Sequence, residues 1–253
     1  MHIETAGQGP DLVLLHGWGM HGGVWDGVCD ALARKFRVHV VDLPGYGGST
    51  ACHPYTLGEL ALSIAASMPQ RVTVCGWSLG GQVALRWALD APRQVARLIL
   101  VATTPCFVKL ADWDCGMDAA VFDEFAEGVH NNGAAALSRF MSLQAQGDAA
   151  ARSVAATLRD GLKARALPDA DVLHAGLRVL RDTDLRGEAE RITQPAVVVH
   201  GECDALVPCA AGRWLVQHMP QAKLHVMTGA AHAPFLSDPE AFVRVLADDR
   251  FDE

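Results

Sequence analysis

The segment Gly76-Trp77-Ser78-Leu79-Gly80 matches the pattern G-x-S-x-G and lies at a sharp change in the character of the sequence. The apolar run 72–75 precedes it, and an amphipathic stretch at 79–90 follows and stops before Pro92. A serine on a tight strand-to-helix turn is accessible for reaction, and glycines beside it let the strand and helix approach closely. The context therefore predicts that Ser78 is a nucleophile at the end of a strand. A serine that only caps a helix is the alternative interpretation.

Working outward from this turn, apolar runs alternate with helical patterns along much of the chain. We expect helices at 56–67, 79–90, 210–218 and 239–248, and strands at 11–16, 37–42, 71–76, 98–101, 195–200 and 224–227. Near-continuous apolar strands are typical of a parallel sheet that is covered on both faces. The alternation predicts an α/β fold with a mostly parallel central sheet and helices on both faces.

The stretch 107–190 differs from the rest, because it lacks Val/Ile strand runs and is rich in Ala, Leu, Arg and Asp at helical spacing. We interpret it as a helical cap (lid) inserted into a core formed by 1–106 and 191–253. Ligands bind at the carboxyl edge of open α/β sheets, and the cap is expected to cover that edge.

Length and charge exclude several classes of protein. A chain of 253 residues predicts one large domain, or one domain with an insertion. Its 21 Lys+Arg against 29 Asp+Glu give a formal charge of −8, which argues against a nucleic-acid partner.

The compartment is predicted from the N-terminus, the apolar runs and the cysteines. The first five residues do not resemble a signal peptide, and the apolar runs are too short to span a membrane. Seven cysteines form no C-x-x-C pair. We therefore expect a cytoplasmic protein with reduced thiols and no membrane partner.

A serine nucleophile needs a base and an orienting acid, which in this fold class follow in the order Ser, Asp or Glu, His. Asp204 follows the predicted strand 195–200, and His232 follows the predicted strand 224–227. The carboxyl ends of parallel strands meet at one edge, so the sequence predicts a triad of Ser78, Asp204 and His232. Glu202 is the alternative acid.

The remaining histidines are rivals for the base and are interpreted as supporting residues. Four of them end strands or lie within them, where core or loop-bracing roles are expected: His16, His39, His200 and His225. His130 and His174 belong to the cap stretch and would at most line a pocket. Asp42 is expected to brace a turn.

The developing oxyanion needs two N–H donors. We expect one from the backbone of Leu79, directly after the nucleophile. The other is expected from Trp18, in the glycine-rich loop after the first predicted strand, and the Trp18 ring is expected either to wall the pocket or to pack.

Together these motifs resemble the α/β-hydrolase superfamily. The resemblance rests on His16-Gly17-Trp18-Gly19, Asp42-Leu43-Pro44-Gly45-Tyr46-Gly47, Gly76-Trp77-Ser78-Leu79-Gly80-Gly81, Asp204-Ala205-Leu206-Val207-Pro208 and Ala230-Ala231-His232-Ala233-Pro234-Phe235. Trp77 in the turn and the segment Arg139-Phe140-Met141-Ser142-Leu143-Gln144 narrow it to the BioH family. This family comprises the pimeloyl-[acyl-carrier-protein] methyl ester carboxylesterases of biotin synthesis. The similarity runs over essentially the whole chain.

The resemblance implies an α/β-hydrolase fold and a serine carboxylesterase. Such an enzyme would hydrolyse the methyl ester of pimeloyl-acyl-carrier protein, and also small esters, through an acyl-enzyme. It implies the same triad, no metal or organic cofactor, and a monomer. The implied substrate contacts are Trp18, Ser78, Leu79, Phe140, Met141, Ser142, Leu143 and Gln144.

An acidic carrier protein would be repelled by an acidic enzyme unless the charges are segregated. Between 139 and 165 the cations outnumber the anions, with Arg139, Arg152, Arg159, Lys163 and Arg165 against Asp148 and Asp160. We expect carrier docking at Arg139, Arg152 and Arg159, with a solvated helix face as the alternative. Ala135 and Ala156 stand where the resemblance leads us to expect arginines, so the detailed docking site departs from the family pattern.

Alternatives remain open at this point. A broad-specificity short-chain carboxylesterase or a C–C bond hydrolase would use the same triad, because specificity depends on the cap. A hydrolase-fold receptor for a small ligand, with slow turnover, is the alternative of another class. Serine at position 78 argues against haloalkane dehalogenase and epoxide hydrolase chemistry, in which a carboxylate attacks.

Overall fold

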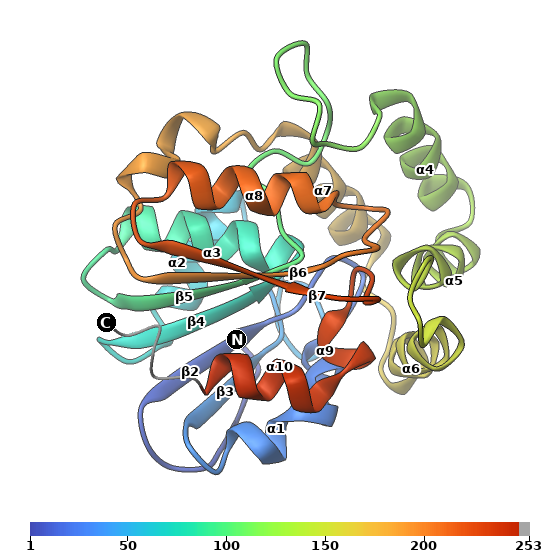
Figure 1. Ribbon diagram of the computed structural model, residues 1–253. Coiled ribbons are helices and arrows are strands. Elements are labelled where there is room, and N and C mark those ends of the chain that lie inside the picture. The colour runs from blue at the N-terminus through green and yellow to red at the C-terminus, as the bar shows by residue number, and fades with distance from the viewer. Residues whose placement is uncertain (248–253) are drawn as a thin grey trace.

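A mostly parallel sheet runs through the protein (Figure 1). The structure is a computed structural model and describes residues 1–247. The seven strands of the sheet lie in the order β1-β3-β2-β4-β5-β6-β7, and only β1 is antiparallel to its neighbour. The strands are β1 Ile3–Ala6, β2 Asp11–Leu15, β3 Arg37–Val41, β4 Val72–Trp77, β5 Val95–Val101, β6 Ala196–Gly201 and β7 Ala222–Met227.

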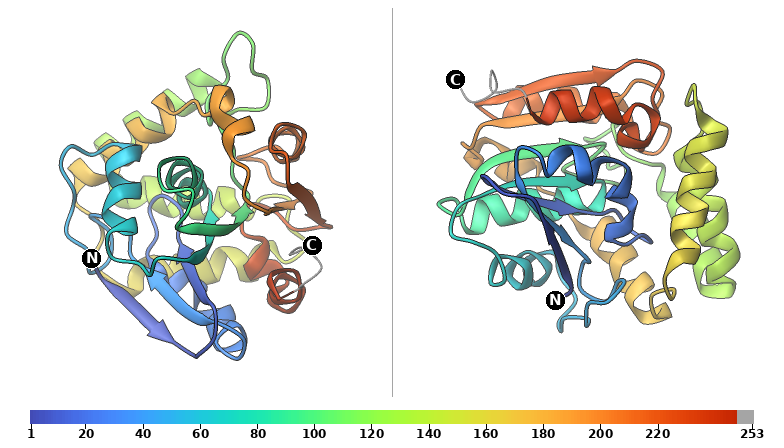
Figure 2. Two further views of the ribbon diagram at one scale, coloured as in Figure 1. Left: turned by 90° about the vertical axis from the view of Figure 1, so that its left-hand side faces the viewer. Right: turned by 90° about the horizontal axis from the view of Figure 1, so that it is seen from below.

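Helices cover both faces of this sheet. Figure 2 shows α1 (Asp26–Leu32) and α10 (Pro239–Leu246) on one face, with α2 (Leu57–Ala65), α3 (Leu79–Asp90) and α8 (Cys209–His218) on the other. Because the inner strands are enclosed in this way, β4 and β6 carry almost uninterrupted apolar residues that are buried. The predicted α/β fold with a mostly parallel sheet and helices on both faces is confirmed.

Local sequence signals fix the ends of several helices. The Thr56 hydroxyl accepts a hydrogen bond from the Glu59 N–H at the start of α2, and the Asp238 carboxylate accepts one from the Ala241 N–H at the start of α10. Pro239 occupies the first turn of α10, where a missing N–H costs nothing. The predicted helix 239–248 extends to residue 248, which lies outside the described residues.

Four helices lie between β5 and β6 in the chain, and we call them the inserted helices. They are α4 (Ala119–Asn131), α5 (Gly133–Gln144), α6 (Ala151–Ala164) and α7 (Ala170–Asp182). In Figures 1 and 2 they lie beyond the carboxyl ends of the strands. Their side chains contact the loops that leave these strands: Leu137 lies against Gly19, and Val172 lies against Gly45.

Polar contacts also join the inserted helices to the rest of the protein. Arg165 donates to Asp42 Oδ2 (2.6 Å) and to Glu4 Oε1 (2.7 Å) at the end of α6. The His21 ring nitrogen Nε2 lies 2.8 Å from the Gly161 carbonyl oxygen, and the Trp18 indole N–H donates to the Leu173 carbonyl (3.0 Å). Three short elements complete the fold. The helix α9 (Pro234–Ser237) directly precedes α10, and two 3-10 helices are η1 (Gly22–Trp25) and η2 (Arg186–Arg191).

The strand β1 and the segment 22–32 are not among the predicted elements. Three of the four residues of β1 are exposed, so an apolar pattern does not mark it. Its pairing with β3, from Ile3 opposite Val41 to Ala6 opposite Val38, depends on a partner more than thirty positions away. Within residues 1–247, no helix has the length and apolar content needed to cross a membrane.

The close packing of β4 on α3 generates a stability prediction. A Cβ added at Gly76 would lie 2.3 Å from the Gly80 carbonyl oxygen, so neither backbone can move away cheaply. We expect Gly76→Ala to lower the free energy of unfolding by about 3 kcal/mol or more, measured by urea denaturation. The control Gly58→Ala in α2 meets no atom within 4 Å and should change that free energy by no more than about 1 kcal/mol. Equal effects of the two variants would contradict the packing argument.

Candidate active site

Ser78 occupies a strained turn between β4 and α3. Its backbone has φ 54° and ψ −117°, a conformation that residues other than glycine rarely adopt. The turn is fixed on both sides, because the Ser78 N–H donates to the Val101 carbonyl (2.9 Å) and the Ser78 carbonyl accepts from the Thr103 hydroxyl (2.7 Å). The side chain is therefore held at the carboxyl edge of the sheet, with 8% of the residue exposed.

Asp204 and His232 meet at the same edge, in the loops after β6 and β7. The His232 ring donates from Nδ1 to Asp204 Oδ2 over 2.8 Å, and both residues are buried. The other oxygen of Asp204 accepts the N–H groups of Leu206 and Val207, each at 2.9 Å. With its proton on Nδ1, the His232 ring keeps an unprotonated Nε2, which is the nitrogen that a general base uses.

Trp77 connects the Ser78 turn to His232. Its indole N–H donates to the His232 carbonyl (2.7 Å), and the centres of the two rings are 5.7 Å apart. Among residues 1–247 no hydrogen bond joins the Ser78 hydroxyl to the His232 ring. Such bonds are often long or poorly aligned in an enzyme without substrate.

The backbone N–H groups of Leu79 and Trp18 are the two candidates for an oxyanion site. Leu79 is the first residue of α3, so its N–H has no partner within the helix. The loop after β2 passes directly beside Ser78, since a Cβ at Gly17 would lie 3.3 Å from Ser78 Cβ. Trp18 follows in this loop, and its N–H donates to no backbone carbonyl among residues 1–247.

His16 holds this loop in place. Its Nδ1 lies 2.8 Å from the Gly17 carbonyl oxygen, and its Nε2 accepts the Leu43 N–H (2.9 Å). The two bonds require a neutral ring that carries its proton on Nδ1. Complete burial disfavours the charged ring and lowers the pKa of His16 to about 4. His200 has a similar supporting position, with Nε2 2.8 Å from the Val207 carbonyl oxygen, and burial lowers its pKa too.

An apolar cavity of about 50 Å³ adjoins this site. Trp18 and Leu206 line it from the core, and the inserted helices supply most of the remaining walls, including Phe125, Phe140 and Leu143. Trp18 packs edge to face against Phe125 and Phe140, with ring centres 5.5 and 5.3 Å apart. The Trp18 ring therefore both walls the cavity and packs against α4 and α5.

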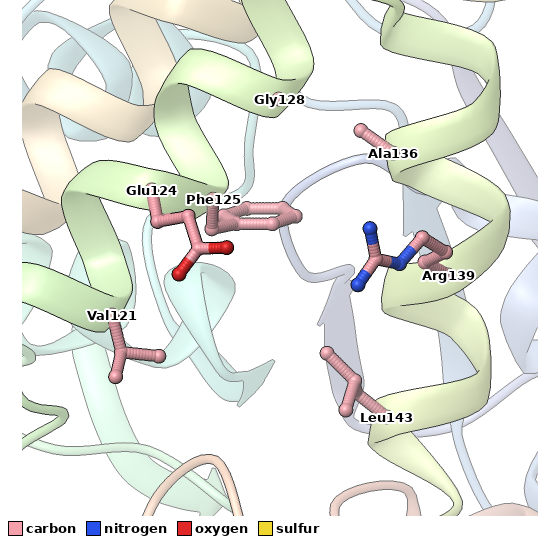
Figure 3. A pocket seen from close by; sticks show the side chains of 7 residues that line it. All are labelled: Val121, Glu124, Phe125, Gly128, Ala136, Arg139 and Leu143. Atoms are coloured by element: carbon pink, nitrogen blue, oxygen red, sulfur yellow. The ribbon is translucent and has the colours of Figure 1, made fainter.

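A surface groove of about 170 Å³ between α4 and α5 shares walls with this cavity (Figure 3). Val121, Phe125 and Leu143 line both. Figure 3 shows Arg139 and Glu124 on opposite sides of the groove. The shared side chains show that the groove adjoins the cavity, and the groove has a charged side chain of each sign in its lining.

The segment from Phe140 to Gln144 is divided between the cavity and the core. Phe140 and Leu143 line the cavity, whereas Met141 is completely buried and Ser142 is exposed. Gln144 is buried and presents its backbone carbonyl to the His232 N–H at 3.1 Å.

The cations of the inserted helices have different environments. Arg139, Arg152 and Lys163 are exposed, and Arg159 is half-buried. Arg165 differs because it is paired with Asp42 and Glu4. Asp148, expected as a surface anion, is 7% exposed and accepts three hydrogen bonds. One cation, Arg165, and one anion, Asp148, are therefore removed from the predicted set of free surface charges, and the cations still outnumber the anions.

The alternative candidates occupy other positions. Glu202 is exposed and accepts the Gly229 N–H (3.1 Å), so it braces the loop that leads from β7 to His232. His39 lies 2.6 Å from Asp11 at the start of β2, the far edge of the sheet. His130 and His174 lie together with ring centres 5.3 Å apart and their planes tilted by 41°. Within residues 1–247 no group of three or more His, Cys, Asp or Glu side chains is arranged to hold a metal ion.

Sequence comparison identifies similar proteins over nearly the whole chain. A model of the "Alpha/beta hydrolase family" matches residues 12–245. A pimeloyl-[acyl-carrier protein] methyl ester esterase from Nitrosomonas europaea is 47% identical over 243 residues, which cover 96% of each chain. A protein of the same name from Chromobacterium violaceum is 42% identical, with 98% of this chain and 97% of that one covered.

Structural comparison gives the same architecture. An esterase from Exiguobacterium antarcticum superimposes with a TM-score of 0.89 at 24% identity, covering all of this chain and 95% of its own. A hydrolase from Pseudomonas aeruginosa superimposes with a TM-score of 0.77 at 27% identity, covering 99% of this chain and 92% of its own. The first of these shows the fold alone.

Burial of a neutral His16 predicts that stability depends on pH. The folded pKa of about 4 lies below the unfolded value of 6.5, so between these values the unfolded chain binds a proton that the folded protein does not. The contribution of a neutral His16 to the free energy of unfolding is therefore fully present above pH 6.5 and decreases as the pH falls toward 4. We expect urea denaturation to show a loss of about 2 kcal/mol from His16 between pH 7.5 and 5, with His200 adding a loss of the same sign.

Nuclear magnetic resonance checks the same prediction directly. The His16 ring signal, assigned by its absence in His16→Gln, should keep its neutral position at pH 5. A His16 ring that titrates near pH 6.5 would contradict the prediction, as would a free energy of unfolding that stays constant between pH 7.5 and 5.

Proposed function

This chain belongs to the alpha/beta hydrolase family, and we propose that it is a serine carboxylesterase that hydrolyses the methyl ester of pimeloyl-acyl-carrier protein in biotin synthesis. Relatives of 39–47% identity that carry this name support the substrate. The observation that carries the chemistry is the Asp204–His232 hydrogen bond of 2.8 Å beside the strained turn of Ser78.

In the acylation step, the Ser78 hydroxyl attacks the ester carbonyl while His232 Nε2 takes its proton. Asp204 holds the opposite nitrogen, Nδ1, and stabilises the imidazolium that forms. The negative oxygen of the tetrahedral intermediate accepts the N–H groups of Leu79 and Trp18. His232 then protonates the departing methoxide, which leaves as methanol, and the acyl group remains on Ser78.

In the second step, water hydrolyses the acyl-enzyme. His232 removes a proton from the water, and the hydroxide attacks the acyl carbonyl at the same oxyanion site. Collapse of the second tetrahedral intermediate returns the proton from His232 to Ser78. The product is the free ω-carboxylic acid on the carrier protein, and the cycle needs no metal or organic cofactor.

The apolar cavity supports an aliphatic acyl group as the substrate. Its walls are side chains such as Phe122, Phe140 and Leu177, which offer no partner to a polar chain. Each methylene that leaves water for such a wall gains about 0.8 kcal/mol. The adjoining groove between α4 and α5 would lead the chain outward to the carrier, whereas Trp18, Ser78 and Leu79 would contact the ester.

We assign carrier docking to the exposed side of α5 and α6. Arg139 lies at the rim of the groove, and Arg152 and Arg159 follow on α6. Arg165 is left out because Asp42 and Glu4 already neutralise it. Position 135 in α5 and position 156 in α6 are alanines, so a carrier has fewer cations to bind on these helices than the family pattern implies.

The same proposal assigns residues 107–190 to a cap and 1–106 with 191–253 to the core. The contacts of Leu137 and Val172 with the loops after β2 and β3 support this division. Residues 248–253 of the second core segment lie outside the described residues. We further expect a monomer that acts in the cytoplasm.

Replacing the nucleophile tests the chemistry. Ser78→Ala should lower kcat/KM for p-nitrophenyl butyrate by at least about 10⁴-fold, because attack by the hydroxyl is lost. Its far-UV circular dichroism should match that of the unaltered protein. Growth of a biotin auxotroph that lacks this step should be restored by the unaltered gene and not by the variant. Esterase activity equal to the unaltered protein in Ser78→Ala would refute the assignment.

Charge reversal on α5 and α6 tests carrier docking. The double variant Arg139→Glu/Arg152→Glu should lower kcat/KM for the carrier-bound ester about 10–100-fold and for p-nitrophenyl butyrate less than about 3-fold. Raising the salt concentration should bring kcat/KM of the unaltered protein and of the double variant closer together on the carrier-bound ester, because salt screens the charges. The control Arg34→Glu has the same type of charge reversal on an exposed residue before β3 and should leave both substrates unaffected. Equal losses on both substrates in the double variant would exclude docking at these arginines.

A further inference from the structure

The loop that carries His232, residues 228–233, is bonded to the segment between α5 and α6. The His232 N–H donates to the Gln144 carbonyl over 3.1 Å, and the Ala149 N–H donates to the Gly229 carbonyl over 2.8 Å. A third bond runs from the Ala231 N–H to Asp148 Oδ2 at 2.7 Å. The segment from Gln144 to Ala149 thus binds the backbone of this loop at three positions, one of them His232 itself.

Asp148 is the side chain at the centre of this contact. Its Oδ2 also accepts the hydroxyl of Ser237 (2.5 Å), which lies beyond His232 in α9, and its Oδ1 accepts the N–H of Ala150 (2.7 Å). One buried carboxylate therefore holds the chain on both sides of His232. Bonds to a charged acceptor are roughly twice as strong as neutral ones, which suits a group that must fix a loop.

The other face of the loop has little freedom. A Cβ at Gly201, at the end of β6, would lie 2.0 Å from the Ala231 carbonyl oxygen, so the loop rests directly on the sheet. The Trp77 indole N–H holds the His232 carbonyl from the nucleophile side. Asp148 and Gln144 close the remaining side. A base must stay within about 0.5 Å of its working position, and these bonds are the contacts that define that position.

We propose that Asp148 is a positioning residue for His232: its carboxylate sets the backbone on either side of the histidine, so that the ring meets Asp204 through Nδ1 and presents Nε2 to Ser78. The inference rests on the serine chemistry of the proposed function. It adds a residue from the connection between α5 and α6 to the machinery that activates the nucleophile, although Asp148 touches neither substrate nor reacting atoms.

The geometry identifies the informative substitution. Asn has one acceptor oxygen and one NH₂ group, whereas Asp148 uses both oxygens as acceptors. Asp148→Asn therefore sets its NH₂ donor against the backbone N–H of either Ala150 or Ala231, whereas the Ser237 hydroxyl can turn to accept from it. A displacement of about 1 Å at a catalytic group costs on the order of 10²-fold in rate.

The experiment compares the rate at which a fluorophosphonate probe labels Ser78 with the kinetics on p-nitrophenyl butyrate. In Asp148→Asn we expect labelling and kcat each to fall by about 10²-fold, with KM within about 3-fold and both values corrected for the folded fraction. The exposed control Asp171→Asn in α7 should react at the unaltered rate. A purely structural role would change the folded fraction and leave the corrected rates unchanged, which would overturn the inference.

A second variant applies if Asp148→Asn does not fold. Ser237→Ala removes one donor and keeps the bond from Ala231, so we expect labelling and kcat to fall several-fold with KM unchanged. Unchanged rates in this variant would overturn the inference. A labelled protein that does not cleave the carrier-bound ester would refute the proposed substrate alone. A protein that the probe does not label would refute the serine chemistry and this inference together.

Discussion

The turn at Ser78 depends on backbones that approach more closely than a Cβ allows. Gly76 lies against the Gly80 carbonyl. A Cβ added at Gly80 would lie only 2.5 Å from the Leu15 carbonyl oxygen. Strand β4, helix α3 and the end of β2 are therefore locked together at one point. The strained backbone of Ser78 persists because Val101, Thr103 and the first turn of α3 bind it from several directions. The other residues of the site surround this fixed serine, which is the nucleophile of the proposed function.

Around this fixed point, the site combines a buried carboxylate with residues that are shielded from water. Asp204 carries its charge inside the protein, where two backbone N–H groups and the His232 ring satisfy it. His16 remains neutral because the same burial disfavours its cation, and a neutral ring is what its two hydrogen bonds need. The apolar cavity beside Trp18 would hold the aliphatic chain of the proposed substrate. Within one edge of the sheet, hydrogen-bond donors therefore stabilise the Asp204 carboxylate, and burial keeps the His16 ring neutral.

Much of this could be predicted from local sequence. The Ser78 turn, Asp204 and His232 follow apolar strand runs, and the parallel sheet brings the ends of such runs together. The weak edge strand β1 and the partners of Arg165 could not be predicted in this way, because both depend on contacts between distant segments. Asp148 shows the limit most clearly: counting charges treats an aspartate in a helical stretch as a surface anion, and nothing local marks the donors that bury it.

The bonds between the α5–α6 segment and the His232 loop bear on how such proteins change their substrates during evolution. An insertion that only shaped a pocket could be exchanged for another as a module. Here the acceptors for the N–H groups of Ala231 and His232 are Asp148 and Gln144, which lie within the stretch that the proposed function assigns to the cap. A new insertion must therefore supply a carboxylate and a carbonyl at the same two places, or the inherited histidine loses its support. On the proposed function, we expect substitutions on the exposed sides of α4 and α5 to alter specificity, and the segment from Gln144 to Ala150 to change only together with the core.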